Sequence, residues 1–229
     1  MFPQDLQLLL NNNDWGGIEN YINTLQKPLS QDIKECLAWS YSRQEKYNEA
    51  IVIYDELLCE QPNNAKWLYS KGYQYYAQKD YQNAVIYFEE ALTVYPNYIK
   101  VKYRISYAYI QLAGNERQWT KDVFWKAINH LKSAHDIYKN FTIEEQEKNR
   151  STYADICALH GRTLVGSSKY IDLAINYLER SLSLKEDLDV RYQLAKAYYF
   201  KKDYTKALEL LPTQGKVAYY ILELKSQIY

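Results

Sequence analysis

Apolar and polar residues follow one another along most of the chain with the spacing of amphipathic α-helices. Ala50 is followed four residues later by Tyr54, and Ala84 is followed in the same way by Phe88. Residues four apart lie on one face of a helix, so each pair predicts a buried helical stripe. Prolines such as Pro96 separate these segments, and proline ends a helix. The pattern therefore predicts an all-α protein.

A five-residue motif that ends in alanine returns along the chain. It reads Lys-Tyr-Asn-Glu-Ala at 46–50, and similar motifs stand 34 residues later at 80–84 and again at 203–207, with looser copies at 123–127 and 169–174. Twelve residues before three of these alanines stands a second small residue. These residues are Ala38, Gly72 and Ala195, with Ser106 and Gly161 in the equivalent place before longer loops. Because small side chains let two helices approach closely, each repeat is predicted to be an αα-hairpin.

The repeats resemble those of the tetratricopeptide repeat (TPR) family, whose units span about 34 residues. The segment 65–98 carries the resemblance most fully, through Gly72, Ala84, Phe88 and Pro96. It implies a right-handed superhelical α-solenoid of TPR helix-turn-helix hairpins, forming a single domain. The expected units are a degenerate repeat at 1–30 and repeats at 31–64, 65–98, 99–140, 154–187 and 188–213.

Three segments depart from the regular repeat. The third unit carries an insertion at 113–122. A linker is expected at 141–153, where Thr142 and Glu145 have the spacing of a capping box that would open a short helix. The residues 215–229 are amphipathic and predict a C-terminal capping helix. That helix also allows a contact with a second copy of the chain, and so a homo-oligomer.

In TPR domains the first helix of each hairpin lines a concave groove, so the resemblance implies that a partner protein or peptide binds there. Counting along each first helix from its small residue gives the side chains that would face this groove. The expected partner-binding residues are Lys66, Tyr69 and Tyr73, then Lys100, Tyr103, Arg104 and Tyr107, and finally Tyr192 and Lys196. The first repeat contributes Asp32, Glu35, Trp39 and Ser42 to the same stripe. The alternative is that the tyrosines pack between helices and the lysines are only solvated.

Some TPR domains bind the C-terminal carboxylate of a partner with a set of lysine, arginine and asparagine side chains. This sequence has only part of that set, so it does not predict this kind of binding. Lys100 and Arg104 match one pair of the set, but Glu35, Trp39 and Ser70 stand where the family's lysine and asparagines would be. A second surface is expected at Trp119 in the insertion, where a tryptophan stands among polar residues. The alternative there is that the ring packs over neighbouring aromatic residues.

Composition argues against nucleic-acid binding through overall charge and against a membrane-spanning segment. The 229 residues carry 28 Lys plus Arg and 28 Asp plus Glu, so no overall basic charge draws the chain to nucleic acid. The 26 tyrosines fit packing between helices. No apolar run is long enough to cross a membrane, and Met1–Asn13 lacks the features of a signal peptide, so a cytoplasmic protein is expected.

No catalytic or metal-binding constellation is predicted. The three cysteines are widely spaced, and among the three histidines only His160 shares a helix face with one of them, Cys157. Two ligands do not complete a zinc site, so neither a metal nor another cofactor is expected. The sequence therefore favours a non-enzymatic scaffold or adaptor. The alternatives are a regulatory subunit that senses a peptide and, less favoured, a repeat protein that binds RNA.

Overall fold

We analysed a computed structural model, which describes residues 3–115, 121–211 and 226. Within these ranges the regular structure is helical and contains no strand, as the sequence predicts. The chain divides into two compact units, residues 1–127 and 128–229, which we call unit 1 and unit 2. The division falls inside one helix, α8 (Lys121–Lys139). Each unit is described on its own.

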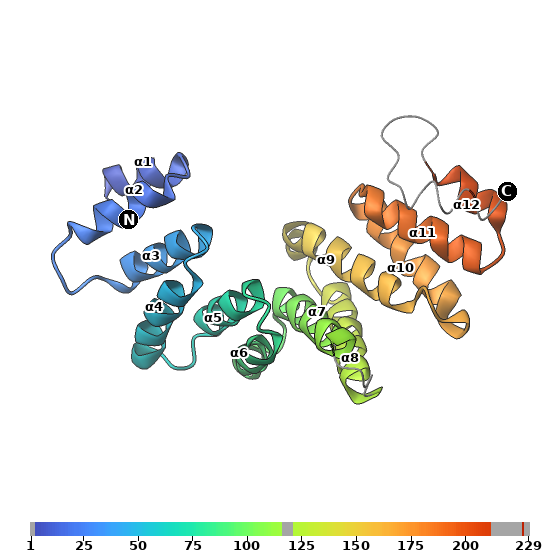
Figure 1. The fold of residues 1–229 in the computed structure, drawn as a ribbon, viewed down its shortest axis with the longest axis horizontal. Coiled ribbons are helices and arrows are strands. Elements are labelled where there is room, and N and C mark those ends of the chain that lie inside the picture. The colour runs from blue at the N-terminus through green and yellow to red at the C-terminus, as the bar shows by residue number, and fades with distance from the viewer. Residues whose placement is uncertain (1–2, 116–120, 212–225, 227–229) are drawn as a thin grey trace. The chain divides into compact units, whose positions relative to one another are not determined.

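Unit 1 consists of successive antiparallel helix pairs (Figure 1). Its helices are α1 (Gln4–Asn11), α2 (Trp15–Asn23), α3 (Gln31–Arg43), α4 (Tyr47–Glu60), α5 (Ala65–Ala77), α6 (Tyr81–Val94), α7 (Ile99–Asn115) and the start of α8. Each helix from α1 to α6 packs against the next one along the chain. The α3–α4 and α5–α6 hairpins occupy the residues predicted for the first two full repeats.

The hairpin turns share one backbone conformation. Glu45 and Lys79 adopt φ values of 61° and 63°, each directly before the residue that precedes the second helix. This left-handed conformation turns the chain sharply between the two helices. The Asp80 carboxylate then accepts a hydrogen bond from the Asn83 backbone N–H at 3.2 Å, which caps α6.

The small residues identified in the sequence lie where helices meet. Ala38, Ala50, Ala84 and Ser106 are fully buried. At Gly72, on α5, a Cβ atom would lie 2.9 Å from the ring of Phe88 on α6. The two helices of a hairpin therefore approach more closely than a larger side chain would allow.

Unit 2 contains the remainder of α8, then α9 (Ile143–Leu164), a 3₁₀ turn (Ser168–Tyr170), α10 (Ile171–Leu184), α11 (Leu188–Phe200) and α12 (Tyr204–Glu209). Most of the segment 141–153, expected as a linker with a short helix, forms the first half of the single helix α9. The predicted capping box is present: Thr142 and Glu145 cap one another. No proline or glycine follows until Gly161, so the helix continues.

The core of unit 2 holds two stacked histidines. His135 Nε2 and His160 Nδ1 share a hydrogen bond at 3.0 Å, and the Tyr177 ring stacks on both imidazoles. Tyr153 Oη lies 3.2 Å from His135 Nδ1. Both histidines are buried, and burial lowers the pKa of His135 to about 4 and that of His160 to about 3. Both imidazoles are therefore neutral at pH 7.

Two expected features lie outside the described residues. Trp119 and its surroundings fall in 116–120, between the end of α7 and the start of α8. The expected C-terminal helix at 215–229 also lies outside the described part of the chain, except for Ser226. Both expectations stay predictions, as does the contact with a second copy of the chain.

Candidate functional site: the groove of unit 1

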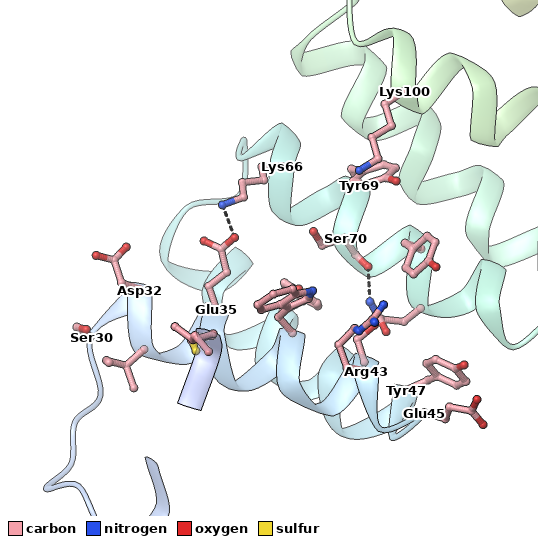
Figure 2. A pocket seen from close by; sticks show the side chains of 18 of the residues that line it. Ser30, Asp32, Glu35, Arg43, Glu45, Tyr47, Lys66, Tyr69, Ser70 and Lys100 are labelled. Carbon is pink, nitrogen blue, oxygen red and sulfur yellow. Dashed lines mark hydrogen bonds and ion pairs between the residues drawn. The ribbon is translucent and has the colours of Figure 1, made fainter. Parts of the chain in front are cut away.

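A cavity of about 1370 Å³ opens along the first helices of the hairpins in unit 1 (Figure 2), and we call it the groove. Most of its lining comes from α3, α5 and α7, as expected for the concave side of such repeats. Of the expected partner-binding residues, Lys66, Tyr69, Tyr73, Lys100 and Arg104 line it. The whole stripe expected from the first repeat, Asp32, Glu35, Trp39 and Ser42, lines it as well.

Arg104, on α7, is held among aromatic rings. Its guanidinium carbon lies 5.4 Å from the centre of the Tyr73 ring, 5.1 Å from that of Tyr76 and 5.3 Å from that of Tyr103. Burial raises the pKa of Tyr76 to about 12, so this phenol is neutral at pH 7 and does not compensate the arginine charge. Arg104 Nε is buried and has no hydrogen-bond acceptor among the described residues. The side chain is thus a rigid cation with one donor unused.

Lys100 lies one turn before Arg104 on the same helix. Its ammonium group stands 5.2 Å from the centre of the Tyr69 ring. Partial removal from water and the nearby Arg104 charge both lower the pKa of Lys100. Within the described ranges, no carboxylate forms an ion pair with either residue. The α7 side of the groove therefore carries two uncompensated positive charges.

Lys66 lines the groove and also forms an ion pair within it. Its ammonium group pairs with the Glu35 carboxylate, and Figure 2 shows this contact between α5 and α3. The other Glu35 oxygen accepts a hydrogen bond from Trp67 Nε1 at 3.3 Å. Lys66 and Glu35 thus connect two repeats, and their charges largely cancel within the groove.

The α3 side of the groove offers an aromatic surface and an acid. Trp39 is 45% exposed, although its ring packs edge-on against Trp15 with ring centres 4.7 Å apart. Asp32 is exposed and has no ion-pair partner in the described part of the chain. It lies across the groove from Lys100 (Figure 2). Arg43 and Glu45, of opposite charge, also line the groove.

Gln74 also lines the groove, although the sequence did not predict it. This side chain is only 2% exposed, and its Nε2 donates a hydrogen bond to the Ser70 backbone carbonyl at 2.9 Å. Its Oε1 receives no hydrogen bond from any described residue. Gln74 is not one of the positions predicted to face the groove when residues are counted along α5 from Gly72, so the helical spacing does not identify it.

The other expected residues make different contacts. Tyr107 packs edge-on against Tyr76, with ring centres 5.6 Å apart, and Tyr103 contacts Arg104 without lining the cavity. Tyr69 lines it but is 8% exposed and packs against Phe88, so it acts largely as a core residue. In unit 2, Tyr192 packs near Ala195 and Leu211, and the Lys196 ammonium lies 5.8 Å from the centre of the Phe200 ring.

No group of three or more histidine, cysteine or acidic side chains within the described residues is placed to hold a metal ion. Cys157 and His160 are both buried in the core of unit 2. No described helix is long and apolar enough to cross a membrane.

Comparison with known proteins fits the hairpin architecture. Two family models described as tetratricopeptide repeat match the sequence, one over residues 37–99 and the other over 189–214. The chain is a tetratricopeptide repeat (TPR) protein. The first match covers the α3–α6 hairpins that form much of the groove, and the second covers α11 and α12 of unit 2. No curated protein matches the TPR protein.

Solved structures share the fold of the TPR protein at low sequence identity. A TPR protein from Parabacteroides merdae is 16% identical, with 97% of this chain and 82% of that chain covered and a TM-score of 0.65. TTC0263, a thermophilic TPR protein of Thermus thermophilus, is 18% identical, with coverages of 87% and 97% and a TM-score of 0.58. YrrB, described as a TPR protein with an unusual peptide-binding site, is 17% identical, with coverages of 98% and 92% and a TM-score of 0.58. At these identities the similarity concerns the fold alone.

Proposed function

We propose that this TPR protein is a non-enzymatic adaptor that captures a segment of a partner protein in the groove of unit 1. The observation that carries the proposal is the groove itself, which is lined by the exposed Trp39 of α3 and by the uncompensated charges of Lys100 and Arg104 on α7. Exposed aromatic rings and arginines are the side chains that most often dominate protein binding. The groove is also large enough for several residues of an extended chain.

Two comparisons support this assignment without deciding it. TPR proteins in general bind other proteins, and YrrB, which has a similar fold, is described as having a peptide-binding site. The cytoplasm stays the expected compartment. A regulatory subunit that senses a short peptide would use the same groove, so ligand size separates the two functions.

The test is affinity capture with the intact chain, followed by groove variants. Trp39→Ala together with Tyr73→Ala should reduce capture of a stoichiometric partner at least tenfold, because both rings line the groove. Far-UV circular dichroism should show unchanged helicity. Full retention of the partner by this folded variant would contradict the groove as binding surface. Recovery of only a short peptide would favour the peptide sensor, and binding that falls steeply with salt to RNA would favour the nucleic-acid alternative.

A further inference from the structure

The charges that line the groove are unevenly distributed. On the α7 side stand Lys100 and Arg104, two cations one turn apart without a carboxylate partner in the described part of the chain. On the α3 side stands Asp32, near the start of the helix, which also lacks an ion-pair partner there; Arg43 and Glu45, of opposite charge, line the groove at and just after the end of the same helix. Between them, Lys66 and Glu35 cancel one another. The groove is therefore positive along one side and negative at the other (Figure 2).

We propose that the groove takes an extended peptide segment with opposite charges near its two ends, an acidic side chain against Lys100 and Arg104 and a basic side chain against Asp32. This inference rests on the proposed function, because it specifies the segment that the adaptor captures. Complementary charges orient a bound chain and exclude partners of the wrong charge pattern.

The width of the groove sets the spacing of the two charges. Directly packed helices lie about 8–10 Å apart. Because α3, α5 and α7 pack mainly against α4 and α6, each of the two steps from α3 to α7 is at least this long, and together they span at least about 16–20 Å. An extended chain advances about 3.3 Å per residue. The acidic and basic side chains of the segment should therefore stand at least about five positions apart. The middle of the segment would cross α5 beside Trp39 and Tyr73, where an apolar side chain fits.

Gln74 supplies a separate sign that a polar main chain belongs in the groove. It is almost wholly buried on α5, and its Oε1 is an acceptor without a donor. A buried acceptor left unpaired is unfavourable, so a partner that supplies a donor gains free energy. The main-chain N–H groups of an extended peptide are such donors. Because the atom is shielded from solvent, binding requires the side chain to rotate toward the groove.

The first experiment selects ligands from a display library of random twelve-residue peptides against the intact chain. We expect enrichment of peptides in which one acidic and one basic residue stand at least about five positions apart. Enrichment of purely acidic, purely basic or uncharged peptides that compete for the groove would overturn the inference while leaving the proposed function intact. Enrichment of no peptide by the folded chain would contradict the proposed function, and the inference with it.

The second experiment exchanges charges between protein and peptide. Lys100→Glu should weaken an enriched peptide at least tenfold, and a peptide with its acidic residue changed to lysine should regain most of that loss. Asp32→Lys should also weaken binding of an enriched peptide. A peptide whose basic residue is changed to glutamate should regain most of that loss. Both residues are exposed on their helices, so these changes should not disturb the core. Rescue by the exchanged peptide identifies direct contact, because a structural defect would weaken all peptides alike.

Lys148→Glu provides the matched control. This lysine is exposed on α9 in unit 2 and undergoes the same change of charge. It should leave the affinity of both peptides unchanged. If Trp39→Ala abolishes peptide binding but Lys100→Glu and Asp32→Lys do not alter it, the groove binds peptides and the charge pattern is wrong. If Lys148→Glu weakens binding as much as Lys100→Glu, the effect follows net charge, which also overturns the inference.

Discussion

Single residues decide how closely the helices of this TPR protein pack and which charges its groove presents. Gly72 allows α5 to lie against the Phe88 ring, and Gly161 stands in the same relation to Leu178 in unit 2. Arg104 shows the opposite case, where a long side chain is held in place by the rings of Tyr73, Tyr76 and Tyr103. Tyrosines here serve both as core residues and as supports for a cation.

Gly72→Ala tests the close approach of α5 and α6. The added Cβ would lie 2.9 Å from the Phe88 ring and 3.1 Å from Tyr87 Cβ, so the hairpin must shift. We expect the free energy of unfolding to fall by about 1–3 kcal/mol. Urea unfolding followed by tryptophan fluorescence measures it.

Gly114→Ala is the matched control for this change. A Cβ at Gly114, in α7, would meet no atom within 4 Å. Alanine is also the better helix former by about 1 kcal/mol, so this variant should be as stable as the parent or more stable. A Gly72→Ala variant as stable as Gly114→Ala would contradict the packing described for Gly72.

At the scale of elements, helix starts are defined by side-chain caps and helix ends by the turns that follow. Asp14, Asp80 and Asp203 each accept a hydrogen bond from a backbone N–H three residues later, at the start of the second helix of a hairpin. Thr142 does the same for α9, the longest described helix. These caps satisfy donors that a helix leaves unpaired at its start.

Asp80→Ala tests the cap of α6. Asp80 accepts hydrogen bonds from the Asn83 backbone N–H at 3.2 Å and from Asn83 Nδ2 at 2.7 Å. Removing the carboxylate should lower the free energy of unfolding by about 1 kcal/mol. Thermal unfolding by circular dichroism measures the loss. Asp80→Asn keeps a cap of similar strength and should retain most of the stability, whereas equal losses in both variants would mean that the charge matters and the cap does not.

The sequence did not predict the length of α9 or the ion pair of Lys66. A capping box at Thr142 was recognised, but its helix was expected to be short because the repeat pattern resumes only at 154. The helix instead runs on to Leu164, since no residue in between disfavours it. Lys66 was expected to face a ligand, and whether it meets Glu35 depends on a residue 31 positions earlier in the chain.

At the scale of the whole molecule, the two units differ in their titratable cores. All three histidines of the sequence lie in unit 2, and all five tryptophans lie in unit 1. Burial and, to a smaller extent, the Lys139 charge lower the pKa of His135; burial, His135 and Lys132 lower that of His160. Acid should therefore destabilise unit 2 more than unit 1. Circular dichroism and tryptophan fluorescence can measure the two effects separately.

Acidification should destabilise unit 2 selectively. The folded-state pKa values, about 4 and about 3, lie below the ordinary histidine value of about 6.5, so folding favours the neutral imidazoles. Their contribution to stability is fully present above pH 6.5 and is lost as the pH falls from 6.5 toward 4. At pH 5 each histidine accounts for a loss of about 2 kcal/mol. Urea unfolding at pH 7 and pH 5 should show an earlier loss of helicity at pH 5.

The tryptophan signal and two variants serve as controls for this acid effect. The fluorescence transition, which reports unit 1, should shift much less than the helicity. His160→Phe should remove part of the pH dependence, because phenylalanine fits among the stacked rings and does not titrate. His130→Gln applies the same measurement to the third histidine of unit 2. Equal shifts in both signals, or a pH dependence unaltered by His160→Phe, would contradict this assignment.

The sequence alone determined the helical class, the pairing of helices into hairpins and the TPR family, because these follow from the spacing of residues within about 34 positions. It also predicted which faces of α3 and α5 line the groove, whereas on α7 only Lys100 and Arg104 of the four expected residues do so. Only the tertiary structure decided the chemistry of that groove. It pairs Glu35 with Lys66 and surrounds Arg104 with three rings. It also buries Gln74 at the wall of the groove. The reason is physical. A helical period specifies which residues share a face, whereas their partners come from other helices and are set by how those helices pack.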